Sequence, residues 1–204
     1  MVILGLTGSI AMGKTTAAKA FRRLGVPIHD SDAEVHKLLG HRGAAVAQIA
    51  KAFPGVVKND AVDRAALGAK VFADPAALMR LEGILHPLVA ASRDRFLRHA
   101  ARHRKKVVIL DIPLLYEVGA DALCDAVVVV TAPKYLQRLR ALRRPGMTPE
   151  RLAAVLARQL PDDIKRARAD FIVPTSLGRA VSLREIRIIL KVAKVMAGRH
   201  WPPK

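Results

Sequence analysis

The stretch "GLTGSIAMGKTT", Gly5 to Thr16, directly follows the first apolar run of the chain and decides the fold. Within it, Gly8 to Thr15 matches the pattern G-x-x-x-x-G-K-[ST] of a phosphate-binding loop. The apolar run Val2 to Thr7 predicts a strand before the loop, and the periodicity of Lys14 to Leu24 predicts a helix after it. Because the motif requires this context, a nucleoside triphosphate site is favoured over an ordinary glycine-rich turn.

The residue types of this loop suit the binding of phosphates. Backbone N–H groups wrap the phosphates, glycines allow close approach, and the N-terminus of the following helix favours negative charge. The ammonium group of Lys14 reaches the β- and γ-phosphates, and the hydroxyl of Thr15 is a ligand for Mg²⁺. We expect nucleotide contacts from these residues: Gly8, Ala11, Met12, Gly13, Lys14, Thr15 and Thr16.

The composition is typical of a folded protein with both helices and strands. The chain has 204 residues, of which 51% are hydrophobic and 25% charged, which suits one domain with a sizeable core. Cys124 is the single cysteine, which excludes an internal disulfide or a multi-cysteine metal site and favours the cytoplasm. No signal peptide is recognisable, and no apolar run approaches the about 20 residues of a membrane span, so no membrane partner is expected.

The charge balance is strongly positive. The 35 basic and 17 acidic residues give a formal net charge of +18. Such a field attracts nucleotides, nucleic acids or acidic membranes. Because the basic residues are spread over several expected helices rather than gathered in one arm, solvated helix faces account for them better than a nucleic acid partner does.

Four further apolar runs are expected to complete the sheet. Val26 to His29 predicts a second short strand, and Phe171 to Val173 predicts a fifth. Val107 to Leu110 and Ala126 to Thr131 are continuous and β-branched, which is typical of parallel strands buried on both faces. We therefore predict an α/β fold of the P-loop NTPase type, with a parallel five-stranded sheet flanked by helices.

The segment between the second and third strands predicts a helical insertion. From residue 43 to about 104 the pattern is helical, with breaks near Pro54-Gly55, Asp74-Pro75 and His86-Pro87, and no strand is expected there. We interpret 1–204 as a single domain, in which 1–32 and 105–204 form the nucleotide-binding core and about 33–104 forms the insertion.

Helix signals also mark the C-terminal third of the chain. Lys134 to Arg143 predicts a helix that a Pro-Gly break follows, and Thr148 is the expected N-cap of the next one. The capping box Ser182 to Glu185 is expected to begin the last helix. The tail His200 to Lys204 is expected to be frayed.

A kinase of small molecules is the class of P-loop protein that the motifs favour. The N-K-x-D motif of a GTPase is missing, and Asp111 is not followed by the catalytic Glu of an ATPase motor. Asp32 follows the second strand, at the edge where ligands bind in open α/β sheets, so we expect it to accept the proton of an acceptor hydroxyl. Capping of the following helix is the alternative role for Asp32, and the two are compatible.

Basic residues near the Pro-Gly break predict a lid. Gln137, Arg140 and Arg144 are spaced i, i+3 and i+7, so they share one face of a helix. We expect a lid over about 137–160 that brings Arg140 and Arg144 to the transferred phosphoryl group. A merely solvated basic face is the alternative.

With these motifs in order, the chain resembles the dephospho-coenzyme A kinase family nearly from end to end. The motifs that carry the resemblance are "GLTGSIAMGKTT" (Gly5–Thr16), "IHDSDAEVHKLL" (Ile28–Leu39), "RAALGAKVF" (Arg64–Phe72), "LEGILHPLV" (Leu81–Val89), "IPLLYE" (Ile112–Glu117), the Q-x-x-R-x-x-x-R of Gln137, Arg140 and Arg144, "RQ" (Arg158, Gln159) and "RARADFIV" (Arg166–Val173). The D-x-D, H-P and P-L-L-x-E elements in this order are the most specific.

The resemblance implies phosphorylation of the ribose 3′-hydroxyl of dephospho-coenzyme A by ATP, the last step of coenzyme A synthesis. Asp32 matches the catalytic base of the family, Lys14 and Arg140 match groups that stabilise the transferred phosphoryl, and Arg144 contacts the nucleotide. The insertion would bind the coenzyme A moiety, and acceptor contacts are implied for Asp32, His86, Pro113, Leu114, Leu115 and Glu117. ATP, Mg²⁺, a cytoplasmic location and a monomeric state complete the expectation.

The chain departs from the family pattern at two places. The family loop usually has G-G-I-G-S-G-K, whereas Ser9, Ala11 and Met12 stand here, so two permissive glycines are missing. Near the last strand the family often has Asn, and this chain has Thr175. A kinase of another nucleoside or nucleotide, and a nucleic-acid-binding NTPase with salt-dependent binding, are the alternative functions.

Overall fold

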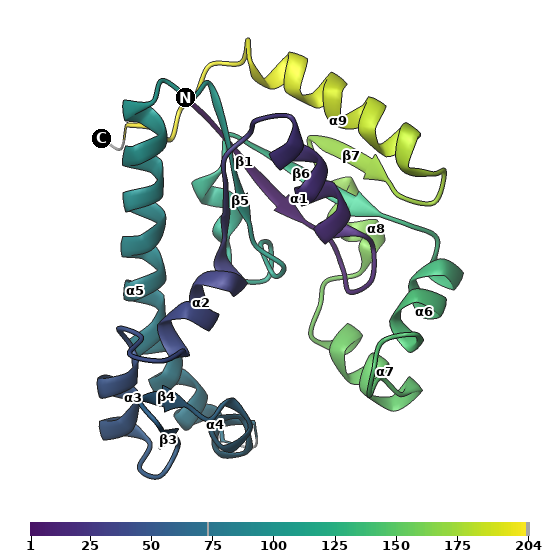
Figure 1. The fold of residues 1–204 in the computed structure, drawn as a ribbon. Helices are drawn as coiled ribbons and strands as arrows, with labels where there is room; N and C mark the ends of the chain where they lie inside the picture. The colour runs from purple at the N-terminus through teal and green to yellow at the C-terminus, as the bar shows by residue number, and fades with distance from the viewer. Residues whose placement is uncertain (73, 203–204) are drawn as a thin grey trace. The chain divides into compact units, whose positions relative to one another are not determined.

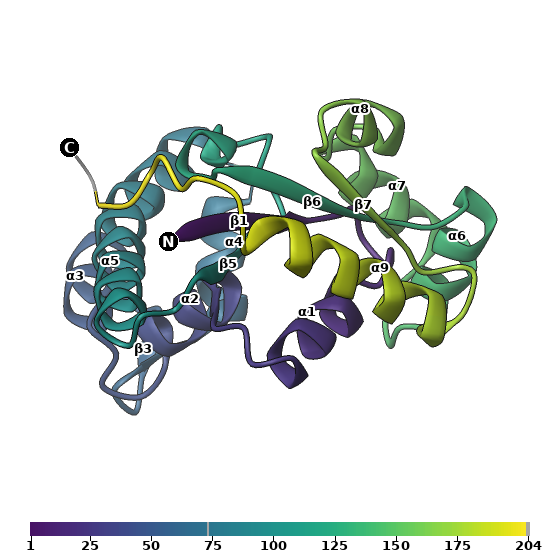
Figure 2. The same ribbon diagram turned by 90° about the horizontal axis from the view of Figure 1, so that it is seen from above.

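The computed structural model describes residues 1–72 and 74–202, which form two compact units (Figures 1 and 2). The first unit comprises Met1–His29 and the segment from Ala100 onward, and the second comprises Asp30–His99. Among the described residues, no helix is both long and apolar enough to cross a membrane.

The first unit is built on a parallel five-stranded sheet, as the sequence predicted, and the structure shows the strand order β2-β5-β1-β6-β7 (Figure 1). β1 lies at its centre and pairs in parallel with β5 and β6, and β6 pairs in parallel with β7. The central strands are buried along their whole length because helices cover both faces. The strands are β1 (Val2–Thr7), β2 (Ile28–Asp30), β5 (Val107–Asp111), β6 (Ala126–Thr131) and β7 (Phe171–Pro174).

Helices α1 (Lys14–Arg23) and α9 (Arg179–Ala193) lie side by side on one face of this sheet (Figures 1 and 2). Phe21 of α1 and Ile186 of α9 are fully buried, and they pack with Leu4 of the central strand in one apolar cluster. The remaining helical elements of the unit are the 3₁₀ turn η1 (Ala120–Leu123), α6 (Lys134–Leu142), α7 (Pro149–Ala157) and α8 (Asp162–Ala167). The predicted N-cap of α7 is confirmed, since the Thr148 hydroxyl accepts a bond from Arg151 N–H.

Two expectations for the C-terminal part are wrong. Helix α9 begins at Arg179, three residues before the expected capping box, and the Ser182 hydroxyl instead donates to Pro174 O at 2.6 Å. The tail is anchored as far as His200, because Asp125 accepts the backbone N–H groups of Arg199 and His200. Tertiary partners that a local pattern cannot reveal explain both differences, and the end of the tail, residues 203–204, lies outside the described residues.

The second unit has its own apolar core and is mostly helical. Ile49, Phe53, Val56 and Leu67 are among its buried residues. Its elements are α2 (Ser31–Leu39), α3 (Val46–Ala52), β3 (Val57–Lys58), β4 (Ala61–Val62), α4 (Arg64–Val71) and α5 (Pro75–Arg102), the last of which continues into the first unit.

The sequence pattern missed one feature of this unit and misplaced another. A short antiparallel hairpin joins β3 to β4, although no strand was expected; its strands have two residues each, too few to form a periodic signal. Helix α5 runs through Pro87, where a break was expected. Proline removes one backbone hydrogen bond, and the apolar side chains Leu85 and Leu88 on either side pack in the core of the unit and keep the helix continuous.

Gly5 in the central strand should tolerate no side chain. A methyl group there would lie 2.6 Å from Leu115 Cδ1 and 2.9 Å from Cys124 Sγ. We expect Gly5→Ala to lower the free energy of unfolding by about 1–3 kcal/mol through overpacking, measured by urea denaturation. Gly83→Ala is the matched control: its methyl group would meet nothing within 4 Å on α5, so it should raise stability by about 0.5–1 kcal/mol. Equal effects of both variants would contradict this explanation.

Candidate active site

The phosphate-binding loop lies between β1 and α1 in the first unit, as the motif predicted. Its two motif glycines are required for different reasons. Gly13 has φ 98°, in the left-handed region that glycine alone adopts without cost. A methyl group at Gly8 would lie 2.5 Å from Val130 O of β6, so no side chain fits at this position.

Two residues at which the loop departs from the family pattern, Ala11 and Met12, differ in their surroundings. Ala11 keeps the left-handed backbone, with φ 61°, a conformation that costs a non-glycine residue roughly 1 kcal/mol. Its methyl group is buried with Ala141 and Leu152. The side chain of Met12 is buried in the core, where its Sδ accepts a bond from Ala132 N–H at 3.1 Å. Nucleotide contacts at these two positions are therefore limited to the backbone.

Lys14 forms an ion pair with Asp111, Nζ to Oδ1 at 2.5 Å. Asp111 is the last residue of β5, and its side chain is only 4% exposed. The sequence pattern gave Asp111 no role beyond that of an ATPase motor, so this contact was not expected. The signal was present, because a carboxylate that ends a buried parallel strand stands at the edge of the sheet where ligands bind.

The first turn of α1 presents hydroxyl groups at an open surface. Thr15 and Thr16 are both exposed, and α1 has no acidic residue in its first turn. The first turn of α1 therefore adds no negative charge of its own that would repel a phosphate at the helix N-terminus.

The two arginines of the lid segment, defined as residues 137–160, differ in their contacts. Arg140 donates to Thr175 twice, to Oγ1 at 2.9 Å and to the carbonyl oxygen at 2.8 Å. Thr175 Oγ1 in turn donates to Met12 O in the phosphate-binding loop at 2.7 Å. Arg144 is exposed, and its side chain has no partner among the described residues. Arg140 is thus fixed beside the loop, while Arg144 is free to reach a ligand.

The residues of the P-L-L-x-E motif after β5 differ in their surroundings. Pro113 accepts a bond from the Thr7 hydroxyl through its carbonyl oxygen, and Leu114 is 36% exposed. Leu115 is fully buried against Gly5 and Cys124. Its side chain belongs to the core of the unit.

Glu117 holds two other segments of the first unit. Its Oε1 pairs with the fully buried Lys165 Nζ at 2.8 Å and accepts a bond from Leu160 N–H at 2.8 Å. Burial raises the pKa of Glu117, but the bonds from Lys165 and Leu160 outweigh burial and hold the pKa below its ordinary value of 4.5. Glu117 therefore ties the end of the lid segment to the loop after β5.

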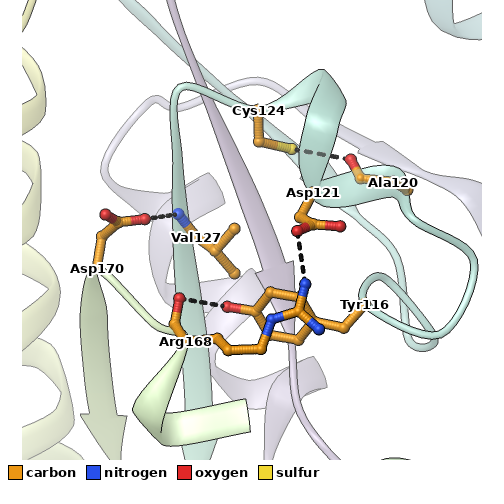
Figure 3. Close-up of polar contacts among 7 residues, drawn as sticks. All are labelled: Tyr116, Ala120, Asp121, Cys124, Val127, Arg168 and Asp170. Atoms are coloured by element: carbon orange, nitrogen blue, oxygen red, sulfur yellow. Dashed lines mark hydrogen bonds and ion pairs between the residues drawn. The ribbon is translucent and has the colours of Figure 1, made fainter.

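A second cluster links the same loop to the turn before β7 (Figure 3). The Tyr116 hydroxyl donates to Arg168 O at 3.0 Å, and the Arg168 guanidinium stacks 4.3 Å from the centre of the Tyr116 ring while donating to Asp121 at 2.9 Å. Burial raises the pKa of Tyr116 to about 12, so the hydroxyl stays protonated and remains a donor. This cluster joins the "IPLLYE" and "RARADFIV" motifs.

The expected base and the histidine lie in the second unit. Asp30 is the N-cap of α2, since its Oδ1 accepts a bond from Ala33 N–H at 2.9 Å. The capping role considered for Asp32 therefore belongs to Asp30, and the exposed Asp32 carboxylate has no side-chain partner within the described part of the chain. His86 is exposed on α5 and likewise has none, so it is not a packed histidine.

Comparisons with known proteins identify the family of the chain. A family model described as dephospho-CoA kinase matches residues 2–178. The chain belongs to the dephospho-CoA kinase family. It is 56% identical to a dephospho-CoA kinase of Rhodospirillum rubrum over 201 residues, which are 98% of this chain and 95% of that protein. The family and the kinase class expected from the sequence are thereby confirmed.

Solved structures agree in fold. The crystal structure of TT1252 from Thermus thermophilus, 31% identical, has a TM-score of 0.82 and covers 96% of this chain and 98% of its own. A dephospho-CoA kinase from Campylobacter jejuni, 25% identical, has a TM-score of 0.64 and covers 94% of this chain and 96% of its own. The parallel sheet with its flanking helices is therefore the fold of this family.

Removing the Glu117 charge should destabilise the protein strongly. Glu117→Gln leaves the buried Lys165 without its counter-charge, so we expect a loss of roughly 3 kcal/mol in the free energy of unfolding. Urea denaturation measures it. The double variant Glu117→Gln with Lys165→Met removes the unpaired charge and should recover part of the loss; no recovery would contradict the ion-pair explanation.

The same carboxylate predicts a pH dependence. Because the pKa of Glu117 is lowered in the folded protein, its stabilisation is complete above the unfolded value of 4.5 and is lost as the pH falls through the folded value. The difference in unfolding free energy between the wild type and Glu117→Gln should therefore be constant near neutral pH and shrink below about pH 4.5. Urea melts from pH 3.5 to 7.5 test this; a constant difference would count against it.

Proposed function

We propose that this chain transfers the γ-phosphoryl group of ATP to the ribose 3′-hydroxyl of dephospho-coenzyme A, giving coenzyme A and ADP. The observation that carries the proposal is the phosphate-binding loop Gly8–Thr15 at the end of β1, in a chain whose relatives are dephospho-CoA kinases over nearly its whole length. The open helix N-terminus and the Lys14 ammonium group supply the positive charge that a triphosphate requires.

The oxygen donors near the loop fit Mg²⁺. The exposed Thr15 hydroxyl and the Asp111 carboxylate are hard donors of the kind that this ion prefers, and we assign them to hold it directly or through water. Bound with ATP, the ion neutralises phosphate charge. Lys14 then leaves Asp111 and binds the β- and γ-phosphates. The ion pair in the present structure thus holds the lysine beside the position at which its phosphate ligands bind.

Proton removal and charge stabilisation are assigned to three side chains. Asp32, whose carboxylate is exposed and not used for capping, accepts the proton of the 3′-hydroxyl. Arg140 uses two of its five N–H groups on Thr175, which leaves three for phosphate oxygens. Arg144 adds its charge when the lid segment closes. Most of the rate enhancement would come from positioning and electrostatics.

The second unit, which contains most of the helical insertion of about 33–104, is proposed to bind the coenzyme A moiety. His86 offers an exposed imidazole there, and in the first unit Pro113 and Leu114 are the remaining acceptor contacts of the P-L-L-x-E motif. We also propose a monomeric cytoplasmic enzyme that binds no nucleic acid; its single cysteine, Cys124, is buried and forms no disulfide, which suits a reducing compartment.

The first test is turnover. Purified protein is incubated with Mg-ATP and dephospho-coenzyme A, coenzyme A is followed by mass spectrometry and chromatography, and Lys14→Ala serves as the blank. Product that depends on Lys14 supports reaction, acceptor and site together. ATP binding without product would refute this acceptor, and a screen of other nucleosides and nucleotides would then identify the alternative.

Asp32 is tested by removing its charge. We expect Asp32→Asn to lower kcat by at least about 100-fold while the Kd for ATP stays within about twofold, because the proton acceptor is lost and the loop is unchanged. Asp60→Asn is the matched control, since it removes the same charge from an exposed turn of the same unit and should leave kcat unchanged. Normal turnover of Asp32→Asn would exclude the base role.

A further inference from the structure

One residue of the phosphate-binding loop has both backbone groups bonded by the lid segment. Ile10 N–H donates to Gln159 Oε1 at 3.0 Å, and Gln137 Nε2 donates to Ile10 O at 3.0 Å. Gln137 lies on α6 and is 7% exposed, and Gln159 follows the end of α7. The two ends of the lid segment therefore meet at a single loop residue.

The next loop residues are held from outside the loop as well. Ile10 packs on the apolar cluster in which Ala11 is buried with Ala141 of α6 and Leu152 of α7. The Thr175 hydroxyl binds Met12 O. Three consecutive loop residues are thus fixed by side chains of other elements.

This loop needs such support more than a glycine-rich one. Within the loop, Met12 N–H donates to Ser9 O at 3.2 Å, but the N–H groups that bind phosphates are not available to hold the loop in shape. Ala11 holds a left-handed backbone that is unfavourable for alanine in a free chain. A loop of this kind keeps its shape only when neighbouring groups determine it.

We propose that Gln137 and Gln159 are positioning residues that hold the loop in its nucleotide-binding shape, so that the loop and the two ends of the lid move together. This rests on the proposed function in that the loop binds ATP. The glutamines are not interchangeable, because Gln159 serves as an acceptor through its amide oxygen and Gln137 as a donor through its amide nitrogen. Closure of the lid then moves only the residues between them.

Removing either bond should weaken ATP binding more than acceptor binding. For Gln137→Leu and Gln159→Leu we expect the Kd for ATP, measured by calorimetry without acceptor, to rise about 3- to 10-fold, which corresponds to one hydrogen bond. The KM for dephospho-coenzyme A should stay within about twofold. Gln48→Leu is the matched control, since this exposed glutamine on α3 lies in the other unit and should change neither value.

Glutamate variants distinguish the two hydrogen bonds, because one glutamine side chain accepts and the other donates. Gln159→Glu keeps an acceptor for Ile10 N–H, whereas Gln137→Glu removes the donor and places a carboxylate against Ile10 O. Both add the same negative charge beside the same loop, so the charge cancels in the comparison. We expect Gln137→Glu to bind ATP at least about 5-fold more weakly than Gln159→Glu. If the two glutamines only filled space beside the loop, the two glutamate variants would bind ATP equally well.

The outcomes separate this inference from the proposed function. If the wild type fails to bind ATP, the proposed function fails. If the wild type binds ATP and the four variants bind it equally well, the positioning role is overturned. If a leucine variant does not fold, as judged by urea denaturation, the comparison of the glutamate variants decides.

Discussion

The structure depends on one constraint: the backbone N–H groups with which a loop binds phosphates are not available to hold that loop in shape. The loop between β1 and α1 is therefore braced by its surroundings. β6 approaches Gly8 so closely that no side chain fits, and Thr175 at the end of β7 binds Met12 O. The lid segment binds Ile10 through two glutamines. The sheet and the lid segment thus together fix the orientation of the peptide groups of the phosphate-binding loop.

The charged side chains near the loop are also held by neighbouring groups. The Lys14 ammonium group is paired with Asp111 and Arg140 with Thr175, so neither cation lacks a partner before a ligand arrives. Behind them, the buried pair of Lys165 and Glu117 ties the end of the lid segment to the loop after β5. A motif that resembles an acceptor-binding sequence therefore also contains a residue that supports the lid. Glu117 could not be assigned to that task without knowing which segment brings Lys165 to it.

Local patterns predicted well where local physics decides the outcome. Continuous β-branched runs marked the strands, and Thr148 before Pro149 marked the start of α7, since burial and capping act over a few residues. They failed where a distant partner competes. Ser182 has the sequence of a capping residue but donates to Pro174 O, and α5 continues through Pro87 because Leu85 and Leu88 pack on either side. Leu115, expected at the acceptor, is core because it fills the space that Gly5 leaves.

The sequence by itself determined the phosphate-binding loop, the strands of the five-stranded sheet, and the family, because each is written in residue types at fixed spacing. Only the tertiary structure decided which polar groups meet: Lys14 with Asp111, Glu117 with Lys165, and Ile10 with Gln137 and Gln159. The reason is physical. Spacing sets which face of an element a side chain occupies, whereas hydrogen bonds between distant segments depend on how those elements pack, and the sequence pattern carries no direct record of that.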